Sequence, residues 1–285
     1  MPVRHPVRSN KRSAIQFSKH VLVGLAVLGL FVVSAGPTVA QEYPLIDRFS
    51  LALGGTNVGL STEIRLDSRS LGEGTTLNFE DDLGLDASKI IPQVSFQFRL
   101  GRRHLFDGHW VKADRNSTSQ ALEEIRFGDI VIPGGSQVAL SYDQEQFSLG
   151  YSYFFLHKDR WALGARVGFR YLSLTSVLSV RELDIEEKGD TAYPLPFLGF
   201  SFRYGITPKW RLISSFGWLD VNVGNVDGSQ YILNAGVEHL TWKHFGFGFG
   251  FNLSDVDVEI DDGEDFTGGA NVSSVSVGIF GRARW

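Results

Sequence analysis

The sequence predicts an all-β protein, a transmembrane up-and-down antiparallel β-barrel of about ten strands, with eight or twelve as alternatives. Three observations support this prediction. Large apolar residues alternate with small or polar ones through most of the chain after residue 41. Short and long breaks in this alternation follow one another in turn. After the N-terminal leader, Gly, Ser or a charge interrupts every apolar run, so a chain that enters a membrane here does so as strands.

The leader differs in composition from the rest of the chain. Among its first 40 residues there are five basic residues and no acidic one, and an uncharged run of 13 residues, VLVGLAVLGLFVV, covers 21–33. About 20 residues are needed to cross a bilayer as a helix, so this run fits the core of a signal peptide better than a retained anchor, which is the alternative. Thr38 and Ala40 suit a cleavage site before Gln41. We therefore predict a cleaved secretory signal over 1–40 and a barrel domain over 41–285.

Composition excludes several classes of function. The 285 residues carry a net charge of −5, and the segment after the leader is more acidic than that, which argues against nucleic acid as a partner. Cysteine is absent, so disulfides and Cys-ligated metals are excluded. We expect no cofactor and no bound metal.

The alternation also predicts which face is apolar. In 245–254 a large apolar residue stands at every second position, and glycine, Asn or Ser stands between. A soluble β-sandwich, the rival fold, usually shows many Lys, Glu and Thr on its outer face. Small residues with isolated arginines suit the crowded interior of a closed barrel, while the aromatic face suits lipid. The expected strands cover 48–66, 88–100, 103–118, 136–156, 159–182, 190–206, 209–224, 228–241, 244–260 and 269–285.

The connections predict the orientation of the strands. Breaks at 101–102, 157–158, 207–208 and 242–243 are short, and aromatic residues cluster beside them, as in an interfacial belt. The alternate breaks, at 67–87, 119–135, 183–189 and 261–268, are longer, with 225–227 as an exception. Periplasmic turns and external loops of a barrel differ in this way. An even strand number then places both mature termini in the periplasm.

A charged layer is predicted inside the barrel. The alternation directs several arginines and one glutamate to the lumen, with Arg284 and Asp107 as further candidates. Enclosed charges are costly unless they pair or are hydrated, so these residues form either an ion-pair network that fills the interior or a path that favours anions. The predicted lumen layer consists of Arg99, Arg166, Arg170, Arg203, Arg211, Glu238 and Arg282.

The last strand carries the chain's clearest family resemblance. Val275, Val277, Ile279, Gly281, Ala283 and Trp285 alternate up to a terminal aromatic residue. This pattern resembles the C-terminal signature of bacterial outer-membrane β-barrel proteins, although Ala283 replaces a common aromatic. The resemblance implies an assembly signal in Trp285, Ile279 and Val277 that the barrel-assembly machinery reads. It also implies outer-membrane lipid and lipopolysaccharide as partners in a Gram-negative envelope. The stretch 75–86, TTLNFEDDLGLD, is similar to the first loop of small uncharacterised proteobacterial outer-membrane proteins.

The positions of the histidines can be compared with those expected for two classes of barrel enzyme. Barrel proteases of the omptin type, similar in strand number, carry an extracellular His with several Asp, whereas the histidines here fall in the leader, at short turns or within strands. A lipid-modifying enzyme could place His109 and His239 on the outer wall, with Ser117 or Ser214 as nucleophile. We consider a satisfied or interfacial histidine the better interpretation of each and expect no catalytic role.

The external loops are acidic. Clusters of Asp and Glu fall in 73–82, 182–190 and 255–265, and the last does not match the spacing of an EF-hand. A solvated surface is the expected state, and a surface adhesion or recognition role is one alternative. The function that we expect is structural, or porin-like passage of small solutes. A lipid-modifying outer-membrane enzyme is the other alternative.

Overall fold

The computed structural model describes residues 44–68, 72, 74–127, 130–261 and 266–285. The chain divides into two units, 1–39 and 40–285, and the predicted signal peptide lies outside the described residues. No helix among the described residues is both long and apolar enough to serve as a membrane span.

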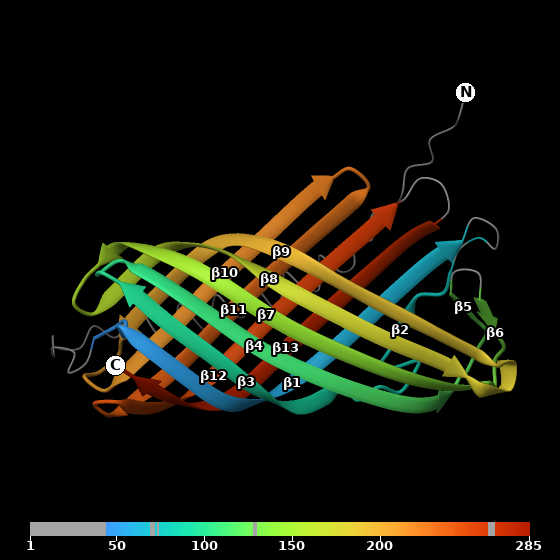
Figure 1. Ribbon diagram of the computed structural model, residues 1–285, viewed down its shortest axis with the longest axis horizontal. Helices are drawn as coiled ribbons and strands as arrows, with labels where there is room; N and C mark the ends of the chain where they lie inside the picture. The colour runs from blue at the N-terminus through green and yellow to red at the C-terminus, as the bar shows by residue number, and fades with distance from the viewer. Residues whose placement is uncertain (1–43, 69–71, 73, 128–129, 262–265) are drawn as a thin grey trace. The chain divides into compact units, whose positions relative to one another are not determined.

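Ten long antiparallel strands of the described chain close into a barrel (Figure 1). Each strand pairs with the next long strand in sequence, and β13 pairs with β1, which leaves no open edge. The two-residue β2 (Leu77–Asn78) extends the sheet beside β1, and β5 (Ile125–Phe127) forms a separate hairpin with β6 (Ile130–Ile132). The predicted barrel is therefore confirmed. Its strands are β1 (Phe49–Ser68), β3 (Ser88–Leu100), β4 (His104–Gln120), β7 (Gln137–His157), β8 (Trp161–Val180), β9 (Ile185–Gly205), β10 (Trp210–Val223), β11 (Val226–Trp242), β12 (Phe245–Asp261) and β13 (Phe266–Arg284).

One predicted loop is wrong. We expected a loop over 183–189, but β8 and β9 are joined by the single 3-10 turn η1 (Arg181–Leu183) and by Asp184, whose φ of 52° lies in the left-handed region. From Ile185 onward β9 pairs with β8. The acidic run after Ile185 lacks apolar alternation, so it gave no strand signal. Backbone pairing with β8 does not require apolar side chains, and the strand extends through it.

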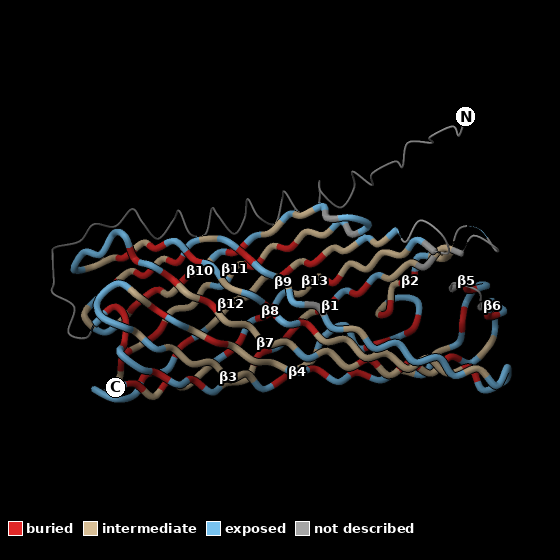
Figure 2. Tube along the Cα trace, turned by 45° about the horizontal axis from the view of Figure 1, so that its top comes forward, coloured by how far each residue is buried: buried red, intermediate tan, exposed pale blue. Residues whose placement is uncertain are grey.

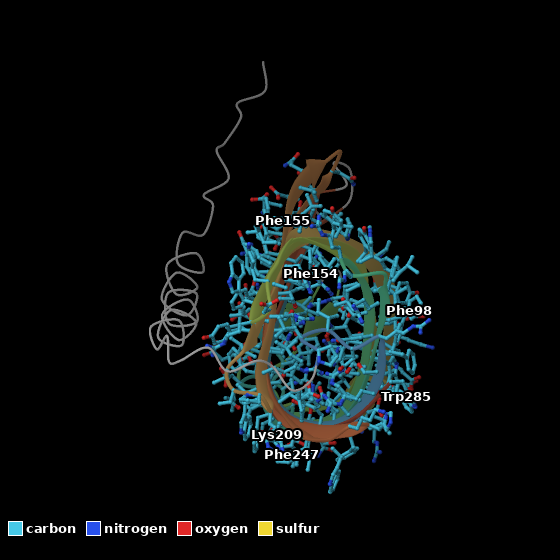
Figure 3. All side chains as sticks on the ribbon, turned by 90° about the vertical axis from the view of Figure 1, so that its left-hand side faces the viewer. Phe98, Phe154, Phe155, Lys209, Phe247 and Trp285 are labelled. Carbon is cyan, nitrogen blue, oxygen red and sulfur yellow. The ribbon has the colours of Figure 1, made fainter. Side chains whose placement is uncertain are left out.

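The large apolar side chains face outward, as the alternation predicted. Phe249 is 55% exposed and Ile279 is 62% exposed, although both lie within long strands and not in turns. Figure 3, a view along the barrel, shows Phe98, Phe155 and Phe247 on the outside and Phe154 in the interior. Small and polar residues occupy the inward positions. A soluble sandwich, with an apolar interior and a polar surface, does not fit this arrangement.

The polarity of the wall reverses along the barrel. On β12 the outward face is apolar from Phe245 to Leu253, and then carries Asp255, Asp257 and Glu259. The inward face changes in the opposite sense, because Val256 is buried there. Buried and exposed residues alternate along the strands in Figure 2. Strands of up to 21 residues exceed the roughly 9–11 that a membrane strand needs. The long-loop half of the barrel therefore continues beyond the apolar band.

The first and second long connections fold onto this projecting half. They contribute Leu83 and Ile132 to an apolar cluster that also contains Val138 and Val180 from the inner wall. The cluster stabilises the long-loop end as an ordinary buried core does. Its complete buried set is Leu77, Phe79, Leu83, Leu85, Ala121, Ile125, Ile132, Val138, Leu140, Tyr142 and Val180.

Candidate functional site

Two of the predicted lumen arginines share one buried glutamate near the short-turn end. Arg211 donates from Nε and from Nη2 to Glu238 Oε2, each at 3.1 Å. Arg282 Nε lies 3.3 Å from the same oxygen. Glu238 is fully buried, so these guanidinium groups supply the charge that keeps its carboxylate stable away from water.

The segment 44–47, which precedes β1 in the chain, contacts this network. Asp47 forms an ion pair with Arg211, and Arg211 Nη1 also donates to the carbonyl of Pro44 at 3.1 Å. Leu45 and Ile46 are buried against a small apolar cluster with Leu105, Phe154 and Ala162. The segment thus lies inside the short-turn mouth of the barrel. The segment is too short to show a period, so alternation does not reveal its position in the sequence. A Leu-Ile pair followed by a carboxylate was its only signal.

Arg166 makes a separate ion pair with Asp107. Arg166 Nη2 lies 2.6 Å from Asp107 Oδ2, and Nη1 contacts Oδ1, so the pair is bidentate. Both residues face inward, from β8 and β4. The strand between them, β7, has Gly150 at this level, where a Cβ would collide with the Arg166 guanidinium. A larger residue at this position would displace the guanidinium from the place that it occupies in the pair.

Arg170 and Arg203 differ from the other buried arginines. They are 3% and 4% exposed, yet neither forms an ion pair with a carboxylate in the described part of the chain. Arg170 Nη1 donates to Ser254 Oγ at 2.6 Å. Arg203 Nη1 donates to the carbonyls of Phe202 at 3.1 Å and Ser214 at 3.0 Å. The hydrogen bonds of both guanidinium groups thus go to neutral acceptors, and Arg203 also lies over the Phe154 ring.

The structure therefore places the predicted lumen residues on the inward face, but at several levels. Arg203 pairs in register with Ala162 on β8, and Arg166 and Arg170 follow four and eight residues later on that strand. Arg99, near the end of β3, is half-buried at the short-turn end. The arrangement is a column of charges along the barrel wall.

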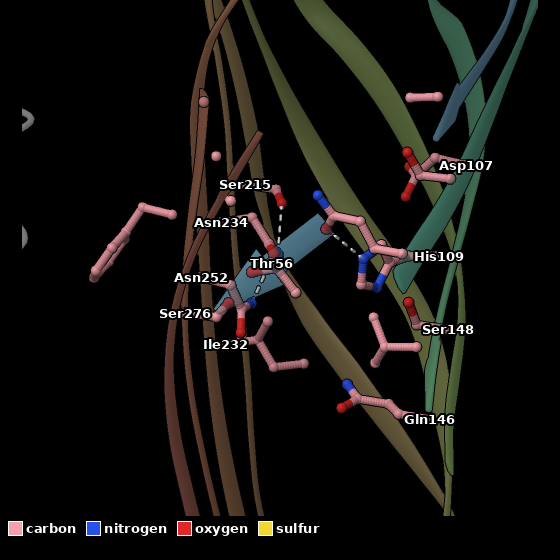
Figure 4. A pocket seen from close by; sticks show the side chains of 18 of the residues that line it. Thr56, Asp107, His109, Gln146, Ser148, Ser215, Ile232, Asn234, Asn252 and Ser276 are labelled. Atoms are coloured by element: carbon pink, nitrogen blue, oxygen red, sulfur yellow. Dashed lines mark hydrogen bonds between the residues drawn. The ribbon is translucent and has the colours of Figure 1, made fainter. Parts of the chain in front are cut away.

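A cavity of about 230 Å³, lined by polar, charged and apolar side chains, lies inside the barrel (Figure 4). Asn252 Nδ2 donates to Asn234 Oδ1 at 2.7 Å, and Asn234 Nδ2 donates to Ser215 Oγ at 3.3 Å. His109 Nε2 lies 3.4 Å from Gln93 Oε1. Neutral hydrogen-bonding side chains line much of the cavity between the charged levels, together with apolar side chains such as Ile91, Ile232 and Phe280. The neutral hydrogen-bonding residues include Thr56, Gln93, Ser95, Gln144, Gln146, Ser148, Ser215, Asn234, Asn252, Ser274 and Ser276.

The histidines do not form the site considered for a lipid-modifying enzyme. His109 lines the interior cavity, so placing it on the outer wall was wrong: it shares the inward parity of Leu105 and Asp107 on β4. His239 packs 4.8 Å from the Trp210 ring, and its Nδ1 lies 3.1 Å from Thr241 Oγ1. Over the described ranges, neither imidazole has a serine as its hydrogen-bond partner. The same ranges contain no group of three or more His, Asp or Glu that could hold a metal ion.

One acidic loop residue is buried instead of solvated. Glu80, from the first long connection, forms an ion pair with the buried Arg115 of β4 and accepts a hydrogen bond from the Thr62 amide at 2.7 Å. Arg115 Nη2 donates to Thr62 Oγ1 at 3.0 Å. Beside this pair, burial raises the pKa of Tyr142 to about 12. The alternation of β4 beyond Ala113 assigns Arg115 to the inner face. Its partner Glu80 lies in a loop that has no alternating pattern, so the sequence does not predict that the two residues meet.

The C-terminal strand closes the barrel. Trp285 and Phe49 exchange backbone hydrogen bonds, Phe49 N to Trp285 O at 3.1 Å and Trp285 N to Phe49 O at 2.9 Å. Their rings lie 5.5 Å apart. Val277 and Ile279 face outward on the same strand. The role of these residues as an assembly signal stays a prediction.

No protein-family model matches the chain, and no curated protein matches it in sequence. Among solved structures, the outer membrane protease OmpT from Escherichia coli is similar, with a TM-score of 0.56 at 10% identity over 88% of this chain and 100% of OmpT. OprG from Pseudomonas aeruginosa is 10% identical over 86% of this chain and 100% of OprG, with a TM-score of 0.41. The translocator domain of NalP from Neisseria meningitidis is 11% identical over 95% of this chain and 99% of that domain, with a TM-score of 0.42. The fold is therefore that of a bacterial outer-membrane β-barrel, and identity this low carries no activity over from these proteins.

Proposed function

We propose that the protein spans the bacterial outer membrane as a porin-like, non-catalytic passage for small polar solutes, with its short-turn mouth held closed by the segment 44–47. The single observation that carries this proposal is the interior cavity, lined in part by polar and charged side chains, of a barrel with an apolar outer band. Polar side chains are expensive to enclose without water or a solute. A lumen with these side chains therefore favours water or a small polar solute.

The dimensions limit what could pass. A barrel of about eight strands is filled by its own side chains, and ten strands add little width. The cavity of about 230 Å³ lies below the 300–1,000 Å³ of ordinary ligand pockets. The proposed solutes are therefore small. Passage requires the segment 44–47 to leave the mouth, which means breaking the Asp47–Arg211 ion pair and exposing Leu45 and Ile46.

The orientation that we propose places the short turns and both mature termini in the periplasm. The polar outer wall of the long-loop half, with Asp255 and Asp257, then lies on the cell surface among lipopolysaccharide headgroups. The apolar band beside the short turns lies in the hydrocarbon. In this orientation the short turns lie on the periplasmic side, which is the side from which an exported chain enters the outer membrane.

Solute flux through liposomes tests the proposal. The full chain, purified and reconstituted, is compared with a Leu45→Ser, Ile46→Ser double variant that weakens the packing of the segment in the mouth. We expect slow uptake of a small neutral sugar with the unmodified protein and uptake several-fold faster with the double variant. Leu122→Ser, at a site that is 87% exposed, is the matched control and should leave the rate unchanged. If both proteins leave the liposomes impermeable, the passage is excluded.

A second candidate function is recognition at the cell surface. The observation that favours it is the projecting half of the barrel, whose acidic outer wall and long connections lie beyond the apolar band. Trimming the whole of 119–135 would remove Ala121, Ile125 and Ile132 from the buried cluster. Glu123→Gln with Glu124→Gln is a milder test, because both side chains are exposed. Adhesion of cells that is lost in this variant while flux is retained would favour recognition.

A further inference from the structure

We infer that Arg170, Ser148 and His109 line a binding site for a small anion, a carboxylate or a tetrahedral oxyanion, inside the barrel. This inference names the solute class of the proposed passage and in that sense rests on the proposed function. Binding itself can be measured without transport.

The charge balance of the barrel interior supports an anion. Asp107 is engaged by Arg166 through both oxygens, and Glu238 serves Arg211 and Arg282 together. Arg170 has no carboxylate partner among the described residues. A guanidinium that is 3% exposed and lacks a counter-ion is costly, because it loses hydration without gaining an opposite charge. A bound anion would supply that charge.

The hydrogen bonds of Arg170 leave donors available. A guanidinium has five N–H groups, and Nη1 of Arg170 donates to Ser254 Oγ. The Nε atom is buried and has no acceptor within the ranges that the structure describes. Arg170 also lines the cavity. The residue therefore combines an uncompensated charge and an unused buried donor with open space beside it.

Register places further polar groups in a row with Arg170. Ser148 on β7 is the direct cross-strand partner of Arg170 on β8, and His109 on β4 is the direct partner of Ser148. Ser95 on β3 continues the row as the partner of His109. All four line the cavity, and Figure 4 shows His109 and Ser148 next to one another on the wall. Two hydroxyls and a guanidinium at one level can donate to anion oxygens, and His109, whose Nε2 faces Gln93 Oε1, borders the same site.

The size of the cavity sets the size of the anion. A volume of about 230 Å³ accommodates phosphate, sulfate or a short carboxylate, but is small for a nucleotide or a lipid headgroup with its chains. Asp107 stands two positions from His109 on the same face, and it would repel an anion if it were free. The bidentate pair with Arg166 neutralises it.

Titration calorimetry on the full chain in neutral detergent, in a buffer without other small anions, tests the inference. Sodium phosphate and sodium acetate are the two probes, and they distinguish an oxyanion site from a carboxylate site. We expect saturable binding of at least one of them. Arg170→Gln should weaken it about tenfold or more, which is the order of one charge-assisted hydrogen bond. Arg102→Gln removes the same charge at an exposed turn and should leave the affinity unchanged.

A second variant keeps the test decisive if Arg170→Gln does not fold. Ser148→Asp places a carboxylate directly across from Arg170, so it supplies the missing counter-ion and should abolish anion binding while preserving the barrel. Absence of saturable binding to the unmodified protein, or unchanged affinity in a folded Arg170→Gln or Ser148→Asp barrel, would overturn the inference. Anion binding without liposome flux would refute the proposed passage alone. Flux without anion binding would refute this site alone.

Discussion

Asp47 forms an ion pair with Arg211 of β10, which stands four strands away around the barrel from the strand β1 that follows Asp47. The same guanidinium donates to Glu238 and to the carbonyl of Pro44. One arginine thus joins the segment in the barrel mouth to the buried network of the wall. Any change that releases the segment also alters the charge balance of that network.

Asp47→Asn should open the short-turn mouth. The substitution removes the ion pair with Arg211 and keeps the size of the side chain, so the segment 44–47 loses its main polar anchor while Arg211 keeps Glu238. In planar bilayers we expect the open fraction of the barrel to rise several-fold above that of the unmodified protein. Asp159→Asn, in an exposed turn, is the control. Equal open fractions in all three proteins would show that the segment does not control access.

Glu238→Gln should destabilise the barrel strongly. The fully buried carboxylate neutralises two guanidinium groups, and its loss leaves both without that partner away from water. Removing one member of a buried ion pair typically costs about 3–5 kcal/mol. Unfolding in urea, followed by tryptophan fluorescence, measures the change. Glu145→Gln, whose side chain is exposed on β7, provides the comparison, and a loss at Glu238 no larger than at Glu145 would contradict the network.

Phe249→Arg should reveal the depth of the apolar band. Phe249 faces outward on β12 within the band, where an arginine costs about 2–4 kcal/mol at the bilayer midplane. Glu259→Arg changes the same face of the same strand ten positions further on, where we expect almost no cost. Reversible unfolding in lipid vesicles compares the two. Similar costs at both positions would mean that the band extends farther than the outward residues indicate.

Gly248→Ala should destabilise the barrel where Gly250→Ala does not. A Cβ at Gly248 would lie 2.6 Å from Phe280 Cζ and 2.7 Å from the Val237 carbonyl oxygen, whereas at Gly250 the nearest atom, Phe280 Cε1, is 3.8 Å away. Overpacking of this kind costs about 1–3 kcal/mol. Thermal unfolding in detergent reports the difference. Adding Phe280→Leu to Gly248→Ala should restore part of the lost stability. If the double variant is no more stable than Gly248→Ala, the strain comes from the Val237 carbonyl alone.

Asp257→Asn should stabilise the protein at neutral pH and have little effect in acid. Burial, followed by repulsion from Glu259 and Asp255, raises the pKa of Asp257 above 3.8. The folded state therefore holds the proton more tightly than the unfolded state, and the stability that this confers is lost as the pH rises through the raised pKa. The melting temperature of the variant should exceed that of the unmodified protein at pH 7. The difference should shrink as the pH falls below about 4. A gain that is the same at both pH values would exclude ionisation as its cause.

Period-two alternation carried most of the fold prediction. Residues 245–254 assign the lipid face of β12 without any tertiary information, because a strand sends successive side chains to opposite sides and only one set is apolar. The same rule assigns Arg166, Arg170 and Glu238 to the interior. It failed where side chains carry no alternating polarity, as in the acidic start of β9, since backbone hydrogen bonds form there regardless of the side chains.

The sequence by itself determined the strand pattern, the apolar outer face and the inward direction of the arginines, because each of these follows from local periodicity along a single strand. Only the tertiary structure decided which charges meet. Asp47 reaches Arg211 and Glu80 reaches Arg115, whereas Arg170 stands across from Ser148 and has no carboxylate partner in the described part of the chain. Barrel closure and strand register bring these distant positions together, and neither leaves a periodic trace in the chain.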